Sequence, residues 1–370
     1  MLVGIDASRA LRARRTGTEN YSLQLIGHLL ALGSEHRFRL YCDRMPPAGL
    51  FGCGVTPELR VIPFPRLWTH ARLSWEMLQR PPDVLFIPAH VLPLIHRRRS
   101  VVTVHDLGYL HYPEAHTRWQ RAYLQWSTRW NARRSAHLLV DSQATKADLT
   151  ARYRLPPGKM TVVYPGRDET LRPVTDPAAL EEVRARYGLG ERYILHVGTL
   201  QPRKNLLRLV EAFVQVHRDG LQLVLAGKRG WLAEPLFRRV EELGLSEAVR
   251  FPGYVEDADL PALLSGAACF AFPSLYEGFG FPVLEAQACG TPVVASNVSS
   301  IPEVAGDGAL LVDPHDTAAL AEALAGVLSD EALRADLIRR GLANVPRFSW
   351  HRCAEQTLAV LEETSRQVHK

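Results

Sequence analysis

Short apolar runs alternate with longer amphipathic segments along most of the chain. A short apolar run is typical of a buried strand, whereas hydrophobic positions spaced three and four apart are typical of a helix. In the first half, the strand pattern occurs at residues 2–6, 37–42, 84–88, 101–105 and 138–142. The clearest helical patterns between these runs cover residues 21–32 and 119–135. Strands that alternate with helices predict a parallel, doubly wound α/β sheet.

The alternation is interrupted at residues 165–177, where Pro, Gly, Asp and Thr are frequent and a linker is expected. The pattern then restarts, and a length of 370 residues also favours two domains. We therefore predict one domain over residues 1–172 and a second over residues 173–349. In the second half, strands are expected at residues 193–198, 221–227, 249–252, 269–272, 292–296 and 309–312, and helices at 205–216, 234–243, 317–328 and 350–364.

Residues 268–297 combine a strand, a loop with two glycines and a helix that starts near Pro282. Open parallel sheets bind ligands at the carboxyl ends of their strands, and a helix N-terminus attracts phosphate. Backbone N–H groups around Gly280 and Phe281 can therefore meet a diphosphate. Glu277 and Glu285, eight residues apart, can accept hydrogen bonds from vicinal hydroxyls. Taken singly, each glutamate is more simply interpreted as a solvated residue.

Two cations follow the first predicted strand of the second half. Gly198 ends that strand, and Arg203 and Lys204 come just before the next helix. A lysine at a helix start adds a point charge to the helix dipole. Lys204 is therefore well placed to neutralise a diphosphate.

The residues around the two glutamates resemble a family signature. Residues 274–294, SLYEGFGFPVLEAQACGTPVV, are similar to the Glu-x7-Glu motif of the retaining GT-B glycosyltransferases of family 4. The resemblance implies two Rossmann-like domains facing a cleft, with a C-terminal helix at about residues 350–370 crossing back to the first domain. Ser349 fits the N-cap of that helix. The resemblance also implies sugar transfer from a nucleotide diphospho-sugar with retention at the anomeric centre.

The same resemblance implies roles for individual residues. His105 would contact the donor sugar, Glu277 would hold the transferred sugar, and the backbone of Val255 would meet the nucleobase. Many relatives have an arginine where this chain has Thr199. Either Arg203 supplies that positive charge here, or the site has one fewer cation. The expected catalytic residues are His105, Arg203, Lys204 and Glu277, and the expected donor-binding residues are Gly17, Gly198, Lys204, Val255, Phe279, Gly280, Phe281 and Glu285.

The start of the chain bears on the choice of donor. Ile5-Asp6-Ala7 and Thr16-Gly17-Thr18 resemble a subgroup that includes bacterial mannosyltransferases of surface-polysaccharide assembly, although Ser8 departs from its pattern. We therefore expect transfer of mannose from GDP-mannose, with UDP-glucose or another UDP-sugar as the alternative. The acceptor is expected to be a glycan or a lipid-linked acceptor.

No metal or other cofactor is expected. Asp257-Ala258-Asp259 imitates the Asp-x-Asp metal motif of a different glycosyltransferase fold, but it precedes a helical pattern, so helix capping explains it. The five cysteines are odd in number and lack paired metal-ligand spacing. Reduced thiols in the cytosol are the expected state.

The charge differs in sign between the two halves. Residues 1–172 contain 25 lysines and arginines against 13 acidic residues, whereas residues 173–370 contain 19 against 26. Such asymmetry suggests an anionic partner for the first half, either nucleic acid or an acidic membrane face. The sequence contains no nucleic-acid recognition motif, so we expect no nucleic-acid partner.

An aromatic stripe in the first half also bears on a membrane partner. Trp119, Tyr123, Trp126 and Trp130 share one face of a predicted helix, beside Arg118, Arg129 and Arg133. Aromatic rings beside arginines suit a bilayer interface, but packing in the protein core is the stronger alternative for the tryptophans. The N-terminus reads as a strand and no apolar run is long enough to span a bilayer. We expect a cytoplasmic protein, peripheral at the inner membrane face.

Three other functions fit parts of this pattern. A nucleotide-sugar epimerase or hydrolase would use the same architecture, with water as the acceptor in the hydrolase. A phosphorylase would carry pyridoxal phosphate on a lysine, and no residue pattern suggests one. A non-enzymatic nucleic-acid binder would explain the isoelectric point near 9.0 but nothing else.

Overall fold

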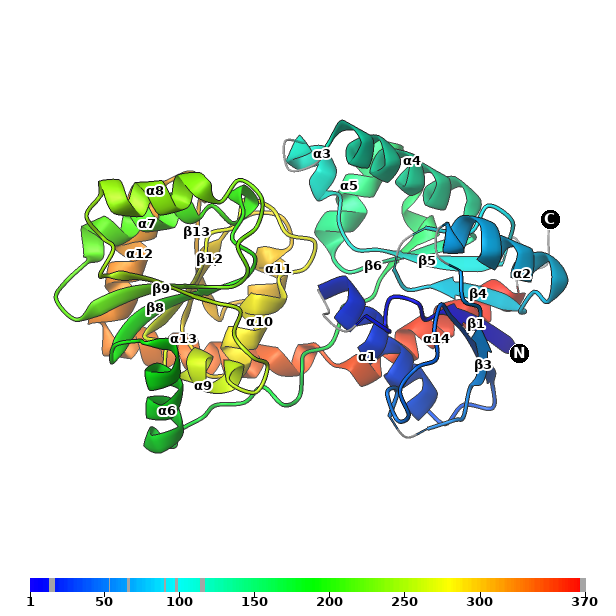
Figure 1. Cartoon of the computed structure of the whole chain (residues 1–370), viewed down its shortest axis with the longest axis horizontal. Helices are drawn as coiled ribbons and strands as arrows, with labels where there is room; N and C mark the ends of the chain where they lie inside the picture. Colours follow the sequence, from blue (N-terminus) through cyan, green and yellow to red (C-terminus); the bar gives the residue numbers. More distant parts are fainter. Residues whose placement is uncertain are drawn as a thin grey trace. The chain divides into compact units, whose positions relative to one another are not determined.

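The structure is a computed structural model of the chain, and it describes residues 1–12, 17–52, 54–64, 67–89, 91–96, 99–113 and 117–366. Thr16, Cys53 and residues 367–370 of the expected last helix therefore lie outside the described residues. The chain forms two compact units. Unit 1 consists of residues 1–166 and 348–370, and unit 2 of residues 167–347. In each unit a sheet lies between layers of helices (Figure 1).

Unit 1 is built on seven parallel strands in the order β3-β2-β1-β4-β5-β6-β7. They are β1 (Leu2–Asp6), β2 (Arg37–Cys42), β3 (Glu58–Val61), β4 (Val84–Ile87), β5 (Ser100–Val104), β6 (His137–Val140) and β7 (Met160–Val162). The five predicted strands are confirmed. The edge strands β3 and β7 were not predicted, because β3 is half polar and β7 has only three residues.

The helices of unit 1 are α1 (Gly17–Ala31), α2 (Ser74–Gln79), α3 (Gly108–His111), α4 (Arg118–Arg134), α5 (Gln143–Tyr153) and α14 (Trp350–Arg366). Neighbouring residues of the central strands face opposite sides of the sheet. In β4, Leu85 and Ile87 join the core that includes residues of α2, α4 and α5. Val84 and Phe86 are buried as well, so β4 is covered on both faces.

Unit 2 is built on six parallel strands in the order β10-β9-β8-β11-β12-β13. They are β8 (Arg192–Val197), β9 (Leu221–Ala226), β10 (Val249–Gly253), β11 (Cys269–Phe272), β12 (Val293–Ser296) and β13 (Ala309–Val312). All six predicted strands are confirmed. The helices are α6 (Pro177–Tyr187), α7 (Leu206–Val216), α8 (Glu234–Glu242), α9 (Leu260–Ser265), α10 (Phe281–Ala288), α11 (Ile301–Ala305), α12 (Thr317–Ser329) and α13 (Glu331–Asn344).

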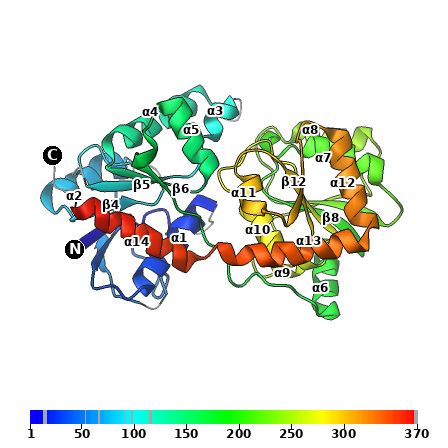
Figure 2. The same ribbon diagram turned by 180° about the vertical axis from the view of Figure 1, so that it is seen from behind.

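The last helix, α14, belongs to unit 1 although unit 2 precedes it in the chain. It packs against α1 and against β4, β5 and β6, as Figure 2 shows from behind. The backbone N–H of Arg352 donates to Ser349 Oγ at 3.4 Å, so Ser349 occupies the predicted capping position. Tyr21 of α1 makes an edge contact with Trp350, with ring centroids 5.7 Å apart. The predicted return of the C-terminal helix to the first domain is confirmed.

The start of α14 leaves no room for a side chain at Gly166. A Cβ at this position would lie 2.1 Å from the backbone nitrogen of Trp350 and 2.5 Å from its Cγ. We expect Gly166→Ala to lower the free energy of unfolding by about 1–3 kcal/mol, because backbone must move. Gly158→Ala is the control, since a Cβ there meets nothing within 4 Å. Equal denaturant midpoints for the two variants would contradict this account.

Candidate functional site

The order of strands in unit 2 determines where a ligand can bind. The chain runs from β8 outward to β9 and β10, and then returns to place β11 on the other side of β8. The loops that leave β8 and β11 therefore diverge to opposite faces of the sheet. In open α/β sheets, the crevice between such loops is the usual nucleotide site. These two loops carry Gly198 to Lys204 and Ser274 to Gly280.

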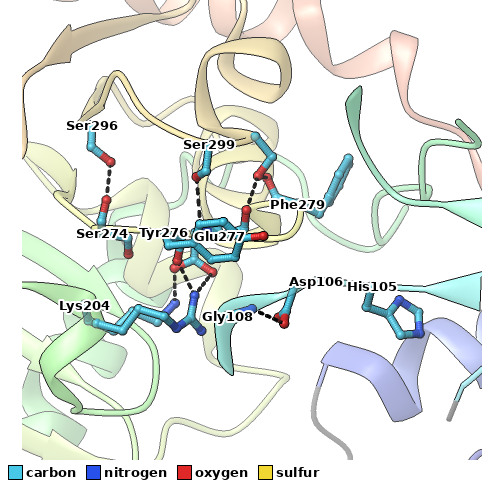
Figure 3. A network of polar contacts seen from close by, with 12 residues as sticks. His105, Asp106, Gly108, Lys204, Ser274, Tyr276, Glu277, Phe279, Ser296 and Ser299 are labelled. Atoms are coloured by element: carbon cyan, nitrogen blue, oxygen red, sulfur yellow. Dashed lines mark hydrogen bonds and ion pairs between the residues drawn. The ribbon is translucent and has the colours of Figure 1, made fainter. Parts of the chain in front are cut away.

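A buried carboxylate joins the two loops. Glu277 is 8% exposed, and its Oε1 accepts a hydrogen bond from Lys204 Nζ at 2.6 Å. Its Oε2 lies 2.8 Å from Arg203 Nη1, which also donates to the backbone carbonyl of Tyr276. Burial alone would raise the pKa of Glu277, but Lys204 and Arg203 outweigh it and lower the pKa to about 2. Figure 3 shows the lysine aimed at this carboxylate, which is ionised at neutral pH.

Two serines hold the backbone of the Glu277 loop from the other side. The N–H of Glu277 donates to Ser299 Oγ at 2.9 Å (Figure 3). Ser300 Oγ donates to the carbonyls of Glu277 and Phe279, at 3.0 and 2.7 Å. Ser299 has a positive φ of 54°, which turns the chain just before α11. The loop is thus fixed by side chains that follow β12 as well as by the cations that follow β8.

The loop leads into the N-terminus of α10. Gly280 precedes the helix with a φ of 111°, a conformation that favours glycine, and no side chain caps the helix there. Phe279 and Phe281 pack edge to face with ring centroids 4.9 Å apart. The positive end of the α10 dipole therefore lies beside the ion pair of Glu277, where an anionic ligand would be stabilised.

Glu285 stands one turn into α10. No described residue forms an ion pair or hydrogen bond with its side chain that would hold it ionised, and it is partly buried. Burial, with smaller contributions from the negative charges of Asp168 and Asp257, raises the pKa of Glu285 to about 7. Its carboxyl group can therefore both donate and accept hydrogen bonds near neutral pH.

The side chains that pack near Lys204 at the ends of β8 and β11 carry no charge at neutral pH. His196 Nδ1 donates to the carbonyl of Ala271 at 3.0 Å, and burial lowers the pKa of His196 to about 3. Phe272 stacks on this imidazole, and Lys204 Nζ lies 4.7 Å from the centre of the Phe272 ring. A Cβ on Gly198 would come within 3.5 Å of Lys204 Cε. That distance is an ordinary van der Waals contact, so it is the φ of 154° at Gly198, rather than lack of space, that favours glycine there.

Not every predicted residue joins this cluster. Val255 follows β10 and is buried, and β9 lies between that strand and β8. Asp259 precedes α9 as expected, but its side chain makes no capping hydrogen bond. Instead it accepts from Arg186 Nη1 at 2.6 Å and from the Tyr187 hydroxyl at 2.7 Å. The capping explanation for Asp259 is therefore wrong, because a nearby guanidinium binds the carboxylate.

The described part of the chain contains no group of three or more His, Cys, Asp or Glu side chains arranged to hold a metal ion. Nor does it contain a helix both long and apolar enough to cross a bilayer.

In unit 1, His105 directly follows β5. Its Nδ1 donates to Asp141 Oδ2 at 2.6 Å and its Nε2 donates to the Pro88 carbonyl at 3.0 Å. Burial alone would lower the pKa of His105, but the Asp141 carboxylate outweighs it and raises the pKa. Asp106, the next residue, accepts a hydrogen bond from the N–H of Gly108 at 2.9 Å. Gly17, the other candidate of unit 1, is the first residue of α1 and is exposed.

Comparison with known proteins gives the class of enzyme. Residues 15–171 match the family described as Glycosyltransferase Family 4, and residues 181–343 match Glycosyl transferases group 1. The O-antigen chain mannosyltransferase B of Escherichia coli is 31% identical over an alignment of 375 positions, gaps included. The alignment covers 96% of this chain and 98% of that protein. The chain belongs to the group 1, family 4 glycosyltransferases.

Solved structures show that this glycosyltransferase has the predicted GT-B fold. Sucrose-phosphate synthase from Thermosynechococcus elongatus matches with a TM-score of 0.77 at 23% identity, covering 98% of each chain. Anabaena Alr3699/HepE in complex with UDP-glucose matches with a TM-score of 0.76 at 20% identity, covering 98% of this chain and 99% of that chain.

In each unit, residues that hold the candidate side chains in place were not predicted. Ser299 and Ser300 act through the backbone of another loop, and Asp141 is 36 residues from the histidine that it pairs with. No local pattern marks such partners. For Asn205 the residue type itself is a local indication, because asparagine is enriched among the non-glycine residues that adopt the left-handed conformation found there.

The raised pKa of Glu285 predicts a pH-dependent stability. Between about pH 4.5 and 7 the folded transferase keeps a proton that the unfolded chain has released, so stability falls as the pH rises through this window. We expect Glu285→Gln to remove about 2–3 kcal/mol of the difference in unfolding free energy between pH 5 and pH 8. Glu322→Gln, on an exposed part of α12, is the control. Equal pH dependence in both variants would show that Glu285 titrates normally.

Proposed function

We propose that this glycosyltransferase moves mannose from GDP-mannose to a glycan or lipid-linked acceptor, with retention at the anomeric centre. The observation that carries the proposal is the meeting of Arg203 and Lys204 with Glu277 at the strand switch point of unit 2. Two cations beside a helix N-terminus suit a diphosphate, and a neighbouring ionised carboxylate suits sugar hydroxyls. This combination matches the chemistry of a nucleotide diphospho-sugar.

The choice of mannose rests on sequence likeness. The opening Ile5-Asp6-Ala7 and the sequence Thr16-Gly17-Thr18 resemble the mannosyltransferase subgroup. The Escherichia coli relative that aligns over almost the whole chain is an O-antigen chain mannosyltransferase. A UDP-sugar is the alternative donor, and one structure of the same fold contains UDP-glucose.

The proposed reaction is a displacement on one face of the sugar. The bond between the anomeric carbon and the diphosphate oxygen breaks, and the acceptor oxygen bonds to that carbon from the same side. The proton of the acceptor hydroxyl moves to an oxygen of the departing diphosphate. Arg203, Lys204 and the N-terminus of α10 stabilise the charge that develops there, so no divalent metal or other cofactor is required.

Unit 1 is proposed to bind an anionic membrane surface, with the protein located in the cytoplasm at the inner membrane face. Trp119, Tyr123 and Trp126 of α4 are 87%, 48% and 41% exposed, so the core interpretation is wrong for these three. It holds for Trp130, which is partly buried against the core. Arg118, Arg129, Arg133 and Arg134 of α4 are exposed beside them, and Arg121 is exposed on the opposite side of the helix.

Exposed apolar side chains continue from α4 onto neighbouring elements. His70, in a helical turn at Trp68–Leu73, bonds to the Tyr123 hydroxyl at 3.0 Å and therefore brings that turn beside α4. Trp75 and Leu78 of α2 are 54% and 55% exposed. Apolar rings beside guanidinium groups suit the boundary between acyl chains and anionic headgroups.

The donor proposal is tested by thermal shift with GDP-mannose, GDP, UDP-glucose and UDP, each with chelator or magnesium. We expect GDP-mannose to stabilise the protein in chelator, by about 2.7 kcal/mol at a hundredfold excess over its dissociation constant. The anomeric configuration of the product is then read by NMR. Stabilisation by UDP-glucose alone would replace mannose, and a requirement for magnesium would overturn the metal-independent mechanism.

Lys204→Gln tests whether the diphosphate binds beside this lysine. Loss of one charged hydrogen-bond donor should weaken nucleoside diphosphate binding about tenfold to a hundredfold. Arg218→Ala removes an exposed cation just before β9, at the opposite edge of the sheet, and should leave binding unchanged. Equal affinities for both variants would place the diphosphate elsewhere.

The membrane proposal is tested by sedimentation with vesicles that contain or lack anionic lipid, at low and high salt. We expect binding only to anionic vesicles and weaker binding at high salt, because each exposed arginine contributes about 1 kcal/mol near such a surface. Trp119→Ser should reduce binding, whereas Trp231→Ser, at a 39% exposed position in unit 2, should not. Binding that ignores lipid charge, or no binding, would favour a soluble acceptor.

A further inference from the structure

Asn205 lies between the two cations and the helix that follows them. It ends the short helical turn Pro202–Lys204 and begins α7 with φ 59° and ψ 34°, in the left-handed region. Asparagine tolerates this region better than most residues, but glycine tolerates it best. The backbone alone therefore does not explain a buried asparagine at this position.

The side-chain amide of Asn205 has a partner for each of its two N–H groups and for its oxygen. Its Nδ2 donates to the carbonyl of Pro273 at 3.1 Å and to the carbonyl of Pro314 at 2.7 Å. Its Oδ1 accepts from Arg208 Nη1 at 3.0 Å. Pro273 follows β11 and Pro314 follows β13, so one side chain connects the ends of two strands to the loop that leaves β8.

These bonds fix one end of the interaction between the two loops of the site. Four residues after Pro273 comes Glu277, whose carboxylate binds Arg203 and Lys204. Between them, the N–H of Leu275 donates to the carbonyl of Arg203 at 2.9 Å. Residues 203–205 and 273–277 are therefore joined at successive points, and Asn205 supplies the innermost one.

We propose that Asn205 is a positioning residue for the reaction. It holds the main chain of Arg203 and Lys204 at a set distance from the Glu277 loop, so that both cations face the diphosphate. This role rests on the proposed function in one respect, namely that these two cations bind the diphosphate. Asn205 itself contacts neither the donor nor the acceptor in this proposal.

Asn344 is a matched control for a purely structural role. It is 7% exposed, as is Asn205. Its Nδ2 donates to Gln287 Oε1 and to the Val304 carbonyl, both at 2.8 Å, and its Oδ1 accepts from Arg347 at 2.7 Å. Its partners lie in α10, α11 and the chain after α13, outside residues 203–205 and 273–277.

The test compares Asn205→Gly and Asn205→Asp with Asn344→Ala. Glycine keeps the left-handed backbone and removes the amide, whereas aspartate keeps Oδ1 but lacks both N–H donors. Alanine at 344 keeps the helical backbone. We expect all three to lower the melting temperature, but only the two Asn205 variants to lower kcat/KM, by about tenfold to a hundredfold. Wild-type kcat/KM in Asn205→Asp would overturn the proposal.

Hydrogen exchange separates this proposal from the function on which it rests. In Asn205→Gly, the amide of Leu275 should exchange faster relative to the rest of unit 2, and in Asn344→Ala it should not. If the wild-type protein binds no nucleotide, the proposed function fails, and this exchange result still shows whether Asn205 holds the two loops together. Unchanged protection of Leu275 in Asn205→Gly would overturn the positioning role.

Discussion

The buried carboxylate of Glu277 is the constraint on which the site of unit 2 depends. Removing one ionised group from water costs several kcal/mol, and a buried carboxylate is stable only when cations and hydrogen bonds offset that cost. Lys204 and Arg203 supply the two cations at 2.6 and 2.8 Å. Any change that moves one of the two loops leaves Glu277 partly unpaired. The ion pair therefore ties the geometry of the site to the stability of the unit.

The fold makes this pairing available at little cost in local structure. Lys204 and Glu277 are 73 residues apart, but they follow strands that lie side by side, with Ile194 of β8 opposite Cys269 of β11. Parallel neighbours end at the same edge of the sheet, so their loops start together. The apolar strands align β8 with β11, and the loops that follow them carry the charged residues. A topology that placed another strand between β8 and β11 would separate the carboxylate from its cations.

The sequence predicted the central strands, both sheets and the candidate residues near Glu277, because apolar runs and strand-end motifs are local signals. It failed at the edges, where β3 is half polar and β7 has three residues. It also did not predict which residues from separate segments of the chain are hydrogen-bonded to each other. The hydrogen bonds of Ser300 to Glu277 and Phe279, and of Asp141 to His105, join separate segments. The exposure of Trp126 was likewise undecidable, because a stripe on a helix shows periodicity but not what covers it.

The pKa values of the two glutamates of the motif are shifted in opposite directions, and this restricts how a proton can move. With a pKa of about 2, Glu277 is ionised at neutral pH, so it can accept hydrogen bonds from a sugar but has no proton to donate. Its contact with two cations also makes it a weak base. Glu285 has a pKa of about 7, but it lies one turn into α10, whereas Glu277 lies in the loop before that helix. In the proposed reaction, the departing diphosphate gains negative charge as the bond breaks and accepts the proton of the acceptor hydroxyl. The ion pair of Glu277 is consistent with that proposal, because it withholds this carboxylate from proton transfer.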